Sequence, residues 1–163
     1  MADVFVEWRS DDSGEICSLA AAARLGCADL HKVHWRESFL ARSGERVICR
    51  FEAPDAESVR LALRRERIQP AAVWTGRIIH GGAAAEADAI VEQAFAAPPA
   101  DLEAALKQLS SARLQPHALK LVTAVVSCDR RRLVCLCKTP PAAAPASRRV
   151  LYGDAWLCRR VGA

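Results

Sequence analysis

The sequence lacks the segments and residue types that mark several specialised protein classes. Aromatic residues make up 6% of the chain, and it has one methionine, one tyrosine and four histidines. Its longest apolar runs, Ile16–Ala23 and Leu119–Val126, are far shorter than the roughly 20 residues of a membrane-spanning helix. Acidic residues at Asp3, Glu7 and Asp11 interrupt any secretory leader. We therefore expect a cytoplasmic protein without a membrane partner.

Common catalytic signatures are also missing. The chain contains no GxSxG nucleophile elbow, no GxxxxGK[ST] phosphate loop, no GxGxxG fingerprint and no HExxH metal motif. No catalytic residue can be predicted on this basis, and whether the protein is an enzyme stays open.

The cysteines and the basic residues do not indicate a special chemistry. Seven cysteines are an odd number without the spacing of a disulfide scaffold, so most are expected to be reduced, apolar fillers. Cys135 and Cys137 would face opposite sides of a strand, which disfavours a chelate. The net charge of +4 is dispersed, and the run Arg130–Arg132 lies in an expected turn, so nucleic-acid binding is not expected.

The first half has a clear alternation of strands and helices. Its expected elements are a strand at Asp3–Arg9, a helix at Glu15–Arg24, strands at His31–Ala41 and Arg46–Ala53 joined by a turn at Arg42–Glu45, a helix from Asp55 to before Pro70, and a strand at Ala72–His80. The order βαββαβ predicts a ferredoxin-like unit, in which two helices cover one face of a four-stranded antiparallel sheet.

The second half repeats this pattern in weaker form. Its expected elements are a strand at Ala89–Phe95, a helix at Pro98–Arg113 and hairpin strands at Ala118–Val126 and Arg130–Lys138. At an offset of 86 the halves pair His31 with His117, Arg46 with Arg132, Cys49 with Cys135, Pro54 with Pro140 and Ala56 with Ala142, and Trp74 matches Trp156 after a deletion of four. Pro145 argues against a regular helix at 141–147.

These patterns predict an α+β fold of two tandem ferredoxin-like βαββαβ repeats, packed sheet to sheet as a pseudo-dimeric α+β barrel. The first repeat spans residues 1–80, a linker spans 81–87, and the second repeat spans 88–163 with a degenerate second helix.

The run VICRFEAPDAESVR at Val47–Arg60 resembles a small domain-of-unknown-function family that is often labelled nickel-binding. The resemblance covers roughly residues 3–79. It implies a ferredoxin-like fold that dimerises as an α+β barrel, nickel or another divalent transition metal as a ligand, and no established reaction.

Side chains with suitable metal donors are His31, His34, Cys49 and Glu7, with Glu52 nearby in sequence. Strand alternation places His31 and His34 on opposite faces, so both could hold one ion only if a bulge intervenes. Two alternatives stay open. Cys49 fits a small core residue, and His31 fits a loop or capping role.

The four tryptophans are most simply core residues. If several of them instead line a cavity between two sheets, with His34 and Arg36 as polar anchors, the cavity would bind a small molecule. The residues expected to line such a ligand pocket are Trp35, Arg36 and Trp8.

Two main functions follow as hypotheses. The first is a non-enzymatic protein that binds a metal such as nickel, or a small ligand. The alternative is a small cofactor-independent oxygenase or isomerase acting on a hydrophobic substrate, which rests on fold analogy. A third, assistance to another protein, also stays open. The expected partner is a metal ion or a small molecule, and the chain is expected as a monomeric pseudo-dimer or a further homodimer.

Overall fold

The computed structural model describes residues 1–9, 32–81, 86–140 and 155–162. The helix expected at Glu15–Arg24, the candidate ligand His31 and the irregular segment 141–147 lie outside these residues. Strands dominate the described residues, the pairings of β1 to β4 and of β5 to β8 given below are antiparallel, and two α-helices accompany them, which confirms an α+β fold. No helix in the described ranges is long and apolar enough to span a membrane.

The chain forms two compact units. The first comprises Met1–Arg77 with Arg159–Ala163, and the second comprises Ile78–Cys158. The chain passes from the first unit to the second within the strand Ala72–Gly81 and returns within the strand Ala155–Gly162.

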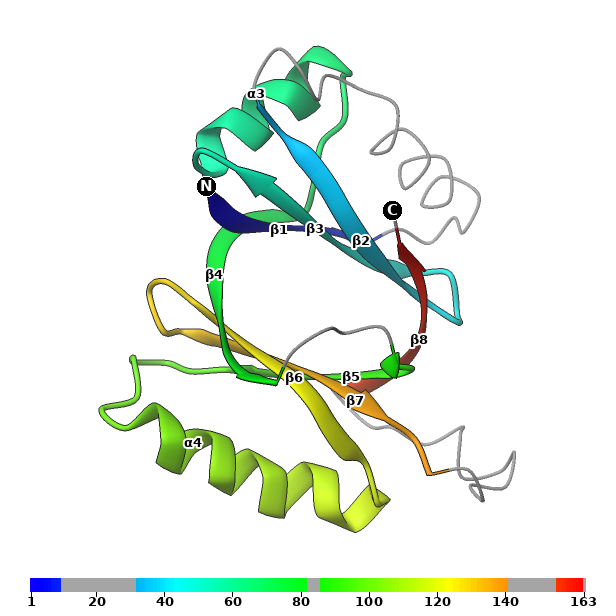
Figure 1. Cartoon of the computed structure of the whole chain (residues 1–163), viewed down its shortest axis with the longest axis vertical. Coiled ribbons are helices and arrows are strands. Elements are labelled where there is room, and N and C mark those ends of the chain that lie inside the picture. Colours follow the sequence, from blue (N-terminus) through cyan, green and yellow to red (C-terminus); the bar gives the residue numbers. More distant parts are fainter. Residues whose placement is uncertain (10–31, 82–85, 141–154, 163) are drawn as a thin grey trace. The chain divides into compact units, whose positions relative to one another are not determined.

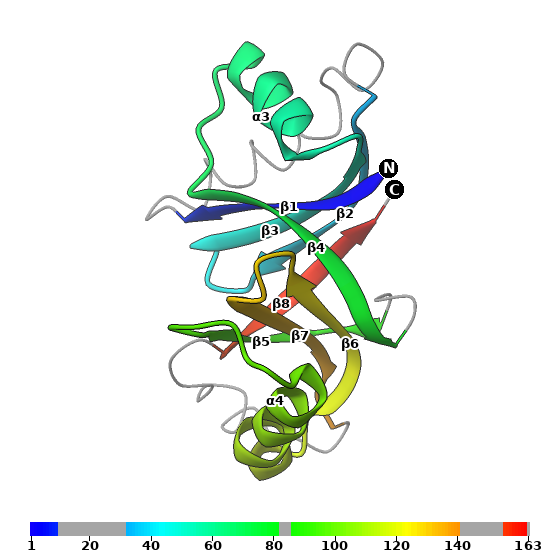
Figure 2. The ribbon, with the colours of Figure 1, turned by 90° about the vertical axis from the view of Figure 1, so that its left-hand side faces the viewer.

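The first unit is built on an antiparallel sheet. Its strands are β1 (Ala2–Arg9), β2 (His34–Ala41), β3 (Arg46–Ala53) and β4 (Ala72–Gly81), arranged in the order β4-β1-β3-β2. Helix α3 (Ala56–Arg65) covers one face of this sheet (Figures 1 and 2). This strand order is the one expected of a ferredoxin-like unit.

Local sequence explains how β3 leads into α3. The Asp55 side chain accepts a hydrogen bond from the backbone N–H of Ser58 at 2.7 Å, which satisfies a free donor at the helix start. Val59, Ala62 and Leu63 then recur at helical spacing and are buried. They contact a cluster formed by alternate residues of the strands: Val4, Val6, Trp8, Val47, Cys49 and Phe51. We call this cluster the helix-side core.

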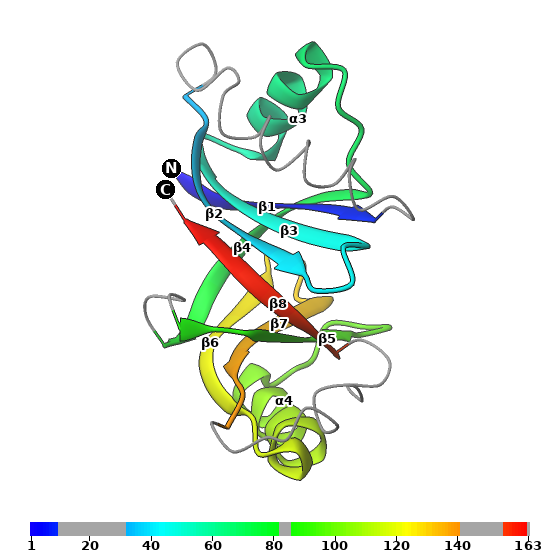
Figure 3. The ribbon, with the colours of Figure 1, turned by 90° about the vertical axis from the view of Figure 1, so that its right-hand side faces the viewer.

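The second unit has the same strand order. Its strands are β5 (Ala89–Ala94), β6 (Lys120–Ser127), β7 (Arg132–Lys138) and β8 (Ala155–Gly162), arranged as β8-β5-β7-β6. Helix α4 (Leu102–Leu109) lies against one face of this sheet (Figure 3). It begins at Leu102 rather than at the expected Pro98, because Asp101 caps it by accepting hydrogen bonds from two backbone N–H groups. A π-helical turn at Ser110–Leu114 and a 3-10 turn at Gln115–His117 follow.

The hairpins of the two units agree residue by residue. Trp35 pairs with Phe51, and at an offset of 86 Leu121 pairs with Cys137. Both hairpins contain a β-bulge at the same place, with Arg36 and Val122 as the extra residues. The other paired residues of β2 and β3 follow the same offset in β6 and β7.

The hairpin turns agree as well. Gly44 and Arg130, again 86 residues apart, both have left-handed φ values, +82° and +58°. Their backbone N–H groups donate to the carbonyls of Ala41 and Ser127 at 2.9 and 2.8 Å. The turn expected at Arg42–Glu45 is therefore present, and the second unit contains the equivalent turn.

The bulge at Arg36 changes the expected faces of β2. Regular strand alternation would place Trp35, Glu37 and Phe39 on one face. Because the bulge adds a residue, Trp35 pairs with Phe51 of the helix-side core, whereas Glu37 pairs with Arg50 on the opposite face.

Gly81, at the end of β4, offers a test of this packing within the second unit. Its φ is +80°, and a Cβ added there would lie 1.9 Å from the carbonyl oxygen of Val122. We expect Gly81→Ala to lower the free energy of unfolding by about 2–4 kcal/mol in urea denaturation, through backbone strain and this clash. Gly44→Ala, where φ is +82°, serves as the control and should cost only about 1 kcal/mol. Equal losses for both variants would contradict the close approach to Val122.

Candidate functional site

The sheet face of the first unit opposite α3 combines aromatic and charged side chains. We call it the second face. Strand pairing and side-chain contacts assign to it Asp3, Phe5, Glu7, Glu37, Phe39, Ile48, Arg50 and Trp74. Side chains of i and i+2 residues share one face of a strand, so β1 alone contributes an acid, an aromatic ring and a second acid in succession.

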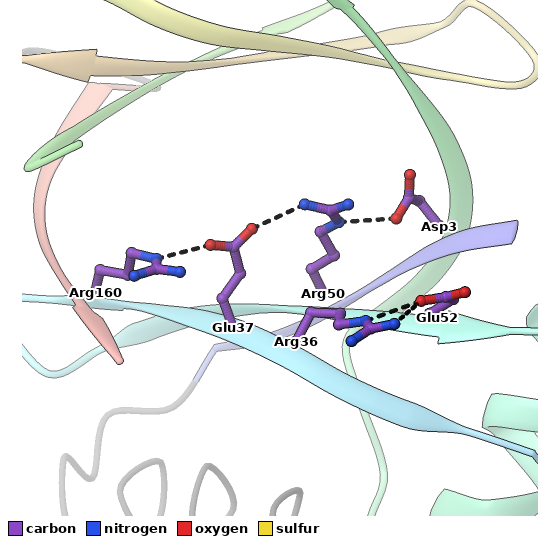
Figure 4. A network of polar contacts seen from close by, with 6 residues as sticks. All are labelled: Asp3, Arg36, Glu37, Arg50, Glu52 and Arg160. Carbon is purple, nitrogen blue, oxygen red and sulfur yellow. Dashed lines mark hydrogen bonds and ion pairs between the residues drawn. The ribbon is translucent and has the colours of Figure 1, made fainter. Parts of the chain in front are cut away.

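Four charged side chains form a continuous network on this face (Figure 4). Arg50 donates through Nε to Asp3 Oδ1 at 2.8 Å and through Nη1 to Glu37 Oε1 at 3.1 Å. Arg160, from β8, donates through Nε to Glu37 Oε2 at 2.7 Å. Both oxygens of Glu37 are thus engaged. We call Asp3, Glu37, Arg50 and Arg160 the charge network.

Electrostatics explain why these residues occur together. The side chain of Glu37 is only 5% exposed, and a buried carboxylate is tolerated where cations and hydrogen bonds compensate its lost hydration. Burial disfavours the charge of Arg50, but hydrogen bonds and charge attraction from Asp3 and Glu37 outweigh this effect and raise the pKa of its guanidinium. The network therefore pairs two guanidinium groups with two carboxyl groups.

An aromatic surface lies on the same face. The rings of Phe5 and Trp74 stack, with centroids 4.5 Å apart and planes inclined by 16°. The indole Nε1 of Trp74 donates to Glu7 Oε1 at 2.7 Å, and Glu7 is buried. Phe5 is buried and Trp74 is partly buried, so this face combines an apolar aromatic pair with hydrogen-bonding groups.

The second unit repeats only part of this chemistry. Trp156 donates to Glu92 Oε1 at 2.8 Å, as Trp74 does to Glu7. The positions that correspond to Glu37 and Arg50 are Thr123 and Leu136, which pair with each other across β6 and β7. The tryptophan–glutamate pair thus belongs to both units, whereas the Glu37–Arg50 ion pair is specific to the first.

The candidate ligand Cys49 lies in the helix-side core. It is fully buried, and its Sγ lies 2.8 Å from Ser38 Oγ. Burial raises the pKa of this thiol to about 12, although the Ser38 hydrogen bond opposes the shift. A thiolate is the form that binds metals, so Cys49 is a poor ligand at neutral pH.

The other predicted metal ligands are not gathered around Cys49. Glu7 lies on the second face, hydrogen-bonded to Trp74, and His34 is exposed at the start of β2 opposite Glu52. Glu52 itself forms an ion pair with Arg36. Among the described residues, no three His, Cys, Asp or Glu side chains lie close enough to hold a metal ion. This part of the chain therefore does not fit a nickel site.

The predicted pocket residues have different surroundings. Trp8 is 3% exposed within the helix-side core, and its Nε1 has no hydrogen-bond partner in the described residues. Trp35 packs against the same core and donates through Nε1 to Ser38 Oγ at 2.9 Å. Arg36, the bulge residue, is half exposed and pairs with Glu52.

Sequence patterns missed the charge network. Regular alternation would put Glu37 on the face of Trp35, and only the bulge reveals its pairing with Arg50. Arg160 is separated from Glu37 by 123 positions and has no local signal. A charged residue between the apolar positions Cys49 and Phe51 was the available clue for Arg50.

The first half of the chain is similar to a known family. Residues 5–75 match the family described as nickel responsive protein SCO4226-like. This match confirms the resemblance inferred from the run Val47–Arg60. A search of curated proteins finds no match to the chain.

Among solved structures, the chain is similar to the crystal structure of an anthrone oxidase-like protein. The TM-score is 0.52 at 10% sequence identity, over 98% of this chain and 92% of that chain. At this identity the likeness concerns the fold alone.

Thiol reactivity tests the burial of the cysteines. With N-ethylmaleimide at pH 8, we expect Cys128, which is exposed, to react in the native protein. Cys49 and Cys135 should not react, because burial raises the pKa of each to about 12 and denies access. Peptide mapping by mass spectrometry measures each site, and labelling in urea provides the control for reactivity. Rapid native labelling of Cys49 would contradict its assignment to the core.

The raised pKa of Cys49 also predicts a pH dependence. Its thiol ionises near pH 9 in the unfolded chain but only near pH 12 in the folded protein. Its contribution to stability is therefore complete below pH 9 and is lost as pH rises towards 12. In urea denaturation, the difference in free energy of unfolding between wild type and Cys49→Ala should shrink between pH 8 and pH 10.5. A constant difference would show that the thiol is not held protonated.

Proposed function

We propose that the protein is a non-enzymatic binding protein for a small organic molecule, which it holds on the second face of the first unit. The observation that supports this most strongly is the charge network. The Glu37–Arg50 pair of this network occurs in one of two sheets. The two sheets otherwise share the strand order, the register, the bulge and the tryptophan–glutamate pair.

The cost of the buried charges supports a role beyond folding. Replacing a buried ion pair by apolar residues of similar volume is often neutral or stabilising. The second unit has Thr123 and Leu136 at the corresponding positions and retains the same strand pairing. Charges that the fold does not require are most readily explained by an interaction that does require them.

The arginines suggest which group of the ligand they contact. A guanidinium carries five N–H donors. Asp3 and Glu37 engage Nε and Nη1 of Arg50 and Nε of Arg160. Further donors of Arg50 and Arg160, whose side chains are 27% and 33% exposed, are suited to an acceptor oxygen.

The Phe5–Trp74 stack suggests the body of the ligand. A planar aromatic surface beside hydrogen-bond donors suits an aromatic molecule with a carbonyl or similar oxygen. We therefore propose an aromatic ketone or a related compound as the ligand class.

The same reasoning extends to the architecture. We propose that the two units are tandem ferredoxin-like repeats, near residues 1–80 and 88–163, that form a pseudo-dimeric α+β barrel. Their common offset of 86 in register, bulge and turn supports a duplication, and the likeness to the anthrone oxidase-like protein supports the fold.

A second candidate function is cofactor-independent oxidation. It is favoured by the structural similarity to the anthrone oxidase-like protein. Its model reaction would convert anthrone and O₂ into anthraquinone and water. In the reaction, the CH₂ carbon of anthrone gains a carbonyl oxygen, and its two hydrogens leave in the water.

Anthrone can test both candidates with one compound. Without oxygen, we expect it to quench tryptophan fluorescence in a saturable manner, and Arg160→Met to weaken binding about tenfold, the equivalent of about 1.4 kcal/mol. Arg36→Met is the matched control, because it removes an arginine–carboxylate pair between β2 and β3 that is not part of the charge network. It should leave the affinity unchanged. In air we expect no anthraquinone above the buffer rate.

Three outcomes would contradict the proposal. Absence of saturable quenching would remove the ligand class. Anthraquinone formation that is lost in Arg160→Met would favour the oxidase. A rise in melting temperature with micromolar nickel, lost in His34→Ala, would favour metal binding in line with the family match, and direct metal analysis of the untagged protein would support that result.

A further inference from the structure

A groove separate from the second face lies on the helix side of the first unit. It runs between α3 and the segment that leads into β4, and its volume is about 510 Å³. This lies within the range of small-molecule sites, roughly 300–1,000 Å³. Its lining consists of Arg60, Arg64 and residues 68–73.

The end of α3 shapes this groove. Arg67 adopts a left-handed φ of +60°, which reverses the chain direction after the helix. Ile68 then donates its N–H to the carbonyl of Leu63 at 2.9 Å and is buried. Ala71 donates to the carbonyl of Glu7 at 2.8 Å, so the segment is fixed at both ends. Ile68, Pro70 and Val73 provide an apolar lining.

Two guanidinium groups line the same groove. Arg60 and Arg64 are four residues apart and therefore lie on one face of α3. Arg60 donates through Nη2 to the carbonyl of Val73 at 3.0 Å and through Nη1 to Glu57 Oε2 at 3.3 Å. Arg64 Nη2 lies 3.5 Å from Glu57 Oε1. Two arginines thus share one carboxylate, which leaves one net positive charge among the three.

The helix C-terminus does not cancel this charge. Free carbonyl groups at a helix C-terminus would repel an anion. In α3, the carbonyls of the last turn already accept hydrogen bonds. Glu66 donates to Ala62, Arg67 donates to Arg64, and Ile68 donates to Leu63.

We propose that this groove binds the carboxylate of a small amphipathic molecule, such as a medium-chain fatty acid. The carboxylate lies between Arg60 and Arg64, where guanidinium groups can form paired hydrogen bonds. The hydrocarbon part lies along Ile68, Pro70 and Val73. The site does not depend on the second face and involves none of its charged residues.

Sodium octanoate tests the proposal on the full chain. Titration calorimetry at low salt should give octanoate an affinity at least tenfold higher than that of 1-octanol, which lacks the charge. Amide resonances of Gln69 and of residues 71–73 should shift on addition of octanoate. Arg64→Met should weaken binding about tenfold. Arg64 is 67% exposed and pairs with the exposed Glu57, so this variant is expected to fold.

Glu57→Gln provides an opposite expectation. It removes the carboxylate that competes for both arginines, so octanoate should bind about threefold more tightly. Arg36→Met and Arg160→Met, outside the groove, should leave octanoate affinity unchanged, and this separates the result from the test of the second face. The proposal is overturned if octanoate does not bind at millimolar concentration, if octanol binds equally well, if the shifts occur elsewhere, or if Arg64→Met binds like wild type.

Discussion

The β-bulge at Arg36 determines which side chains of β2 meet the helix-side core. The extra residue lets Trp35 face Phe51, while Glu37 faces Arg50 on the other side of the sheet. With regular alternation, Glu37 would point into the helix-side core, towards the buried α3 residues Val59 and Leu63. A carboxylate there would have no cation to compensate its lost hydration, and that burial costs several kcal/mol. The bulge thus makes the charge network compatible with a close-packed core.

The same bulge has a different consequence in the second unit. There the extra residue is Val122, and its carbonyl oxygen occupies the place that a side chain at position 81 would need. Glycine with a positive φ is therefore required at the end of β4. One backbone irregularity, repeated at an offset of 86, supports a polar network in one unit and a close backbone contact in the other.

Local sequence predicted those features whose cause is local. The hairpin turn, the strand Arg46–Ala53 and the cap at Asp55 follow from turn residues, alternation and a side chain able to accept from the helix start. The faces of β2 could not be predicted, because a bulge leaves the composition of the strand unchanged. Residue type alone also named Cys49 as a ligand, whereas burial makes its thiol a poor one. The role of Arg160 depends on a contact across 123 positions that no window of sequence contains.

Comparison of the two units separates what the sheet needs from what one unit has added. Glu7 with Trp74, and Glu92 with Trp156, connect the first and last strands of their units in the same way, which indicates a structural role. Glu37 and Arg50 do not recur, since Thr123 and Leu136 occupy the equivalent places without altering the register. The Glu37 carboxylate accepts one hydrogen bond from each of two arginines, and a third bond joins Arg50 to Asp3, so the network presents ordered charges rather than mobile ones. Ordered charges lose little conformational entropy when they engage a ligand, which is the property that makes a preformed site selective. The asymmetry between the units therefore points to the first unit as the part of the chain where recognition is built.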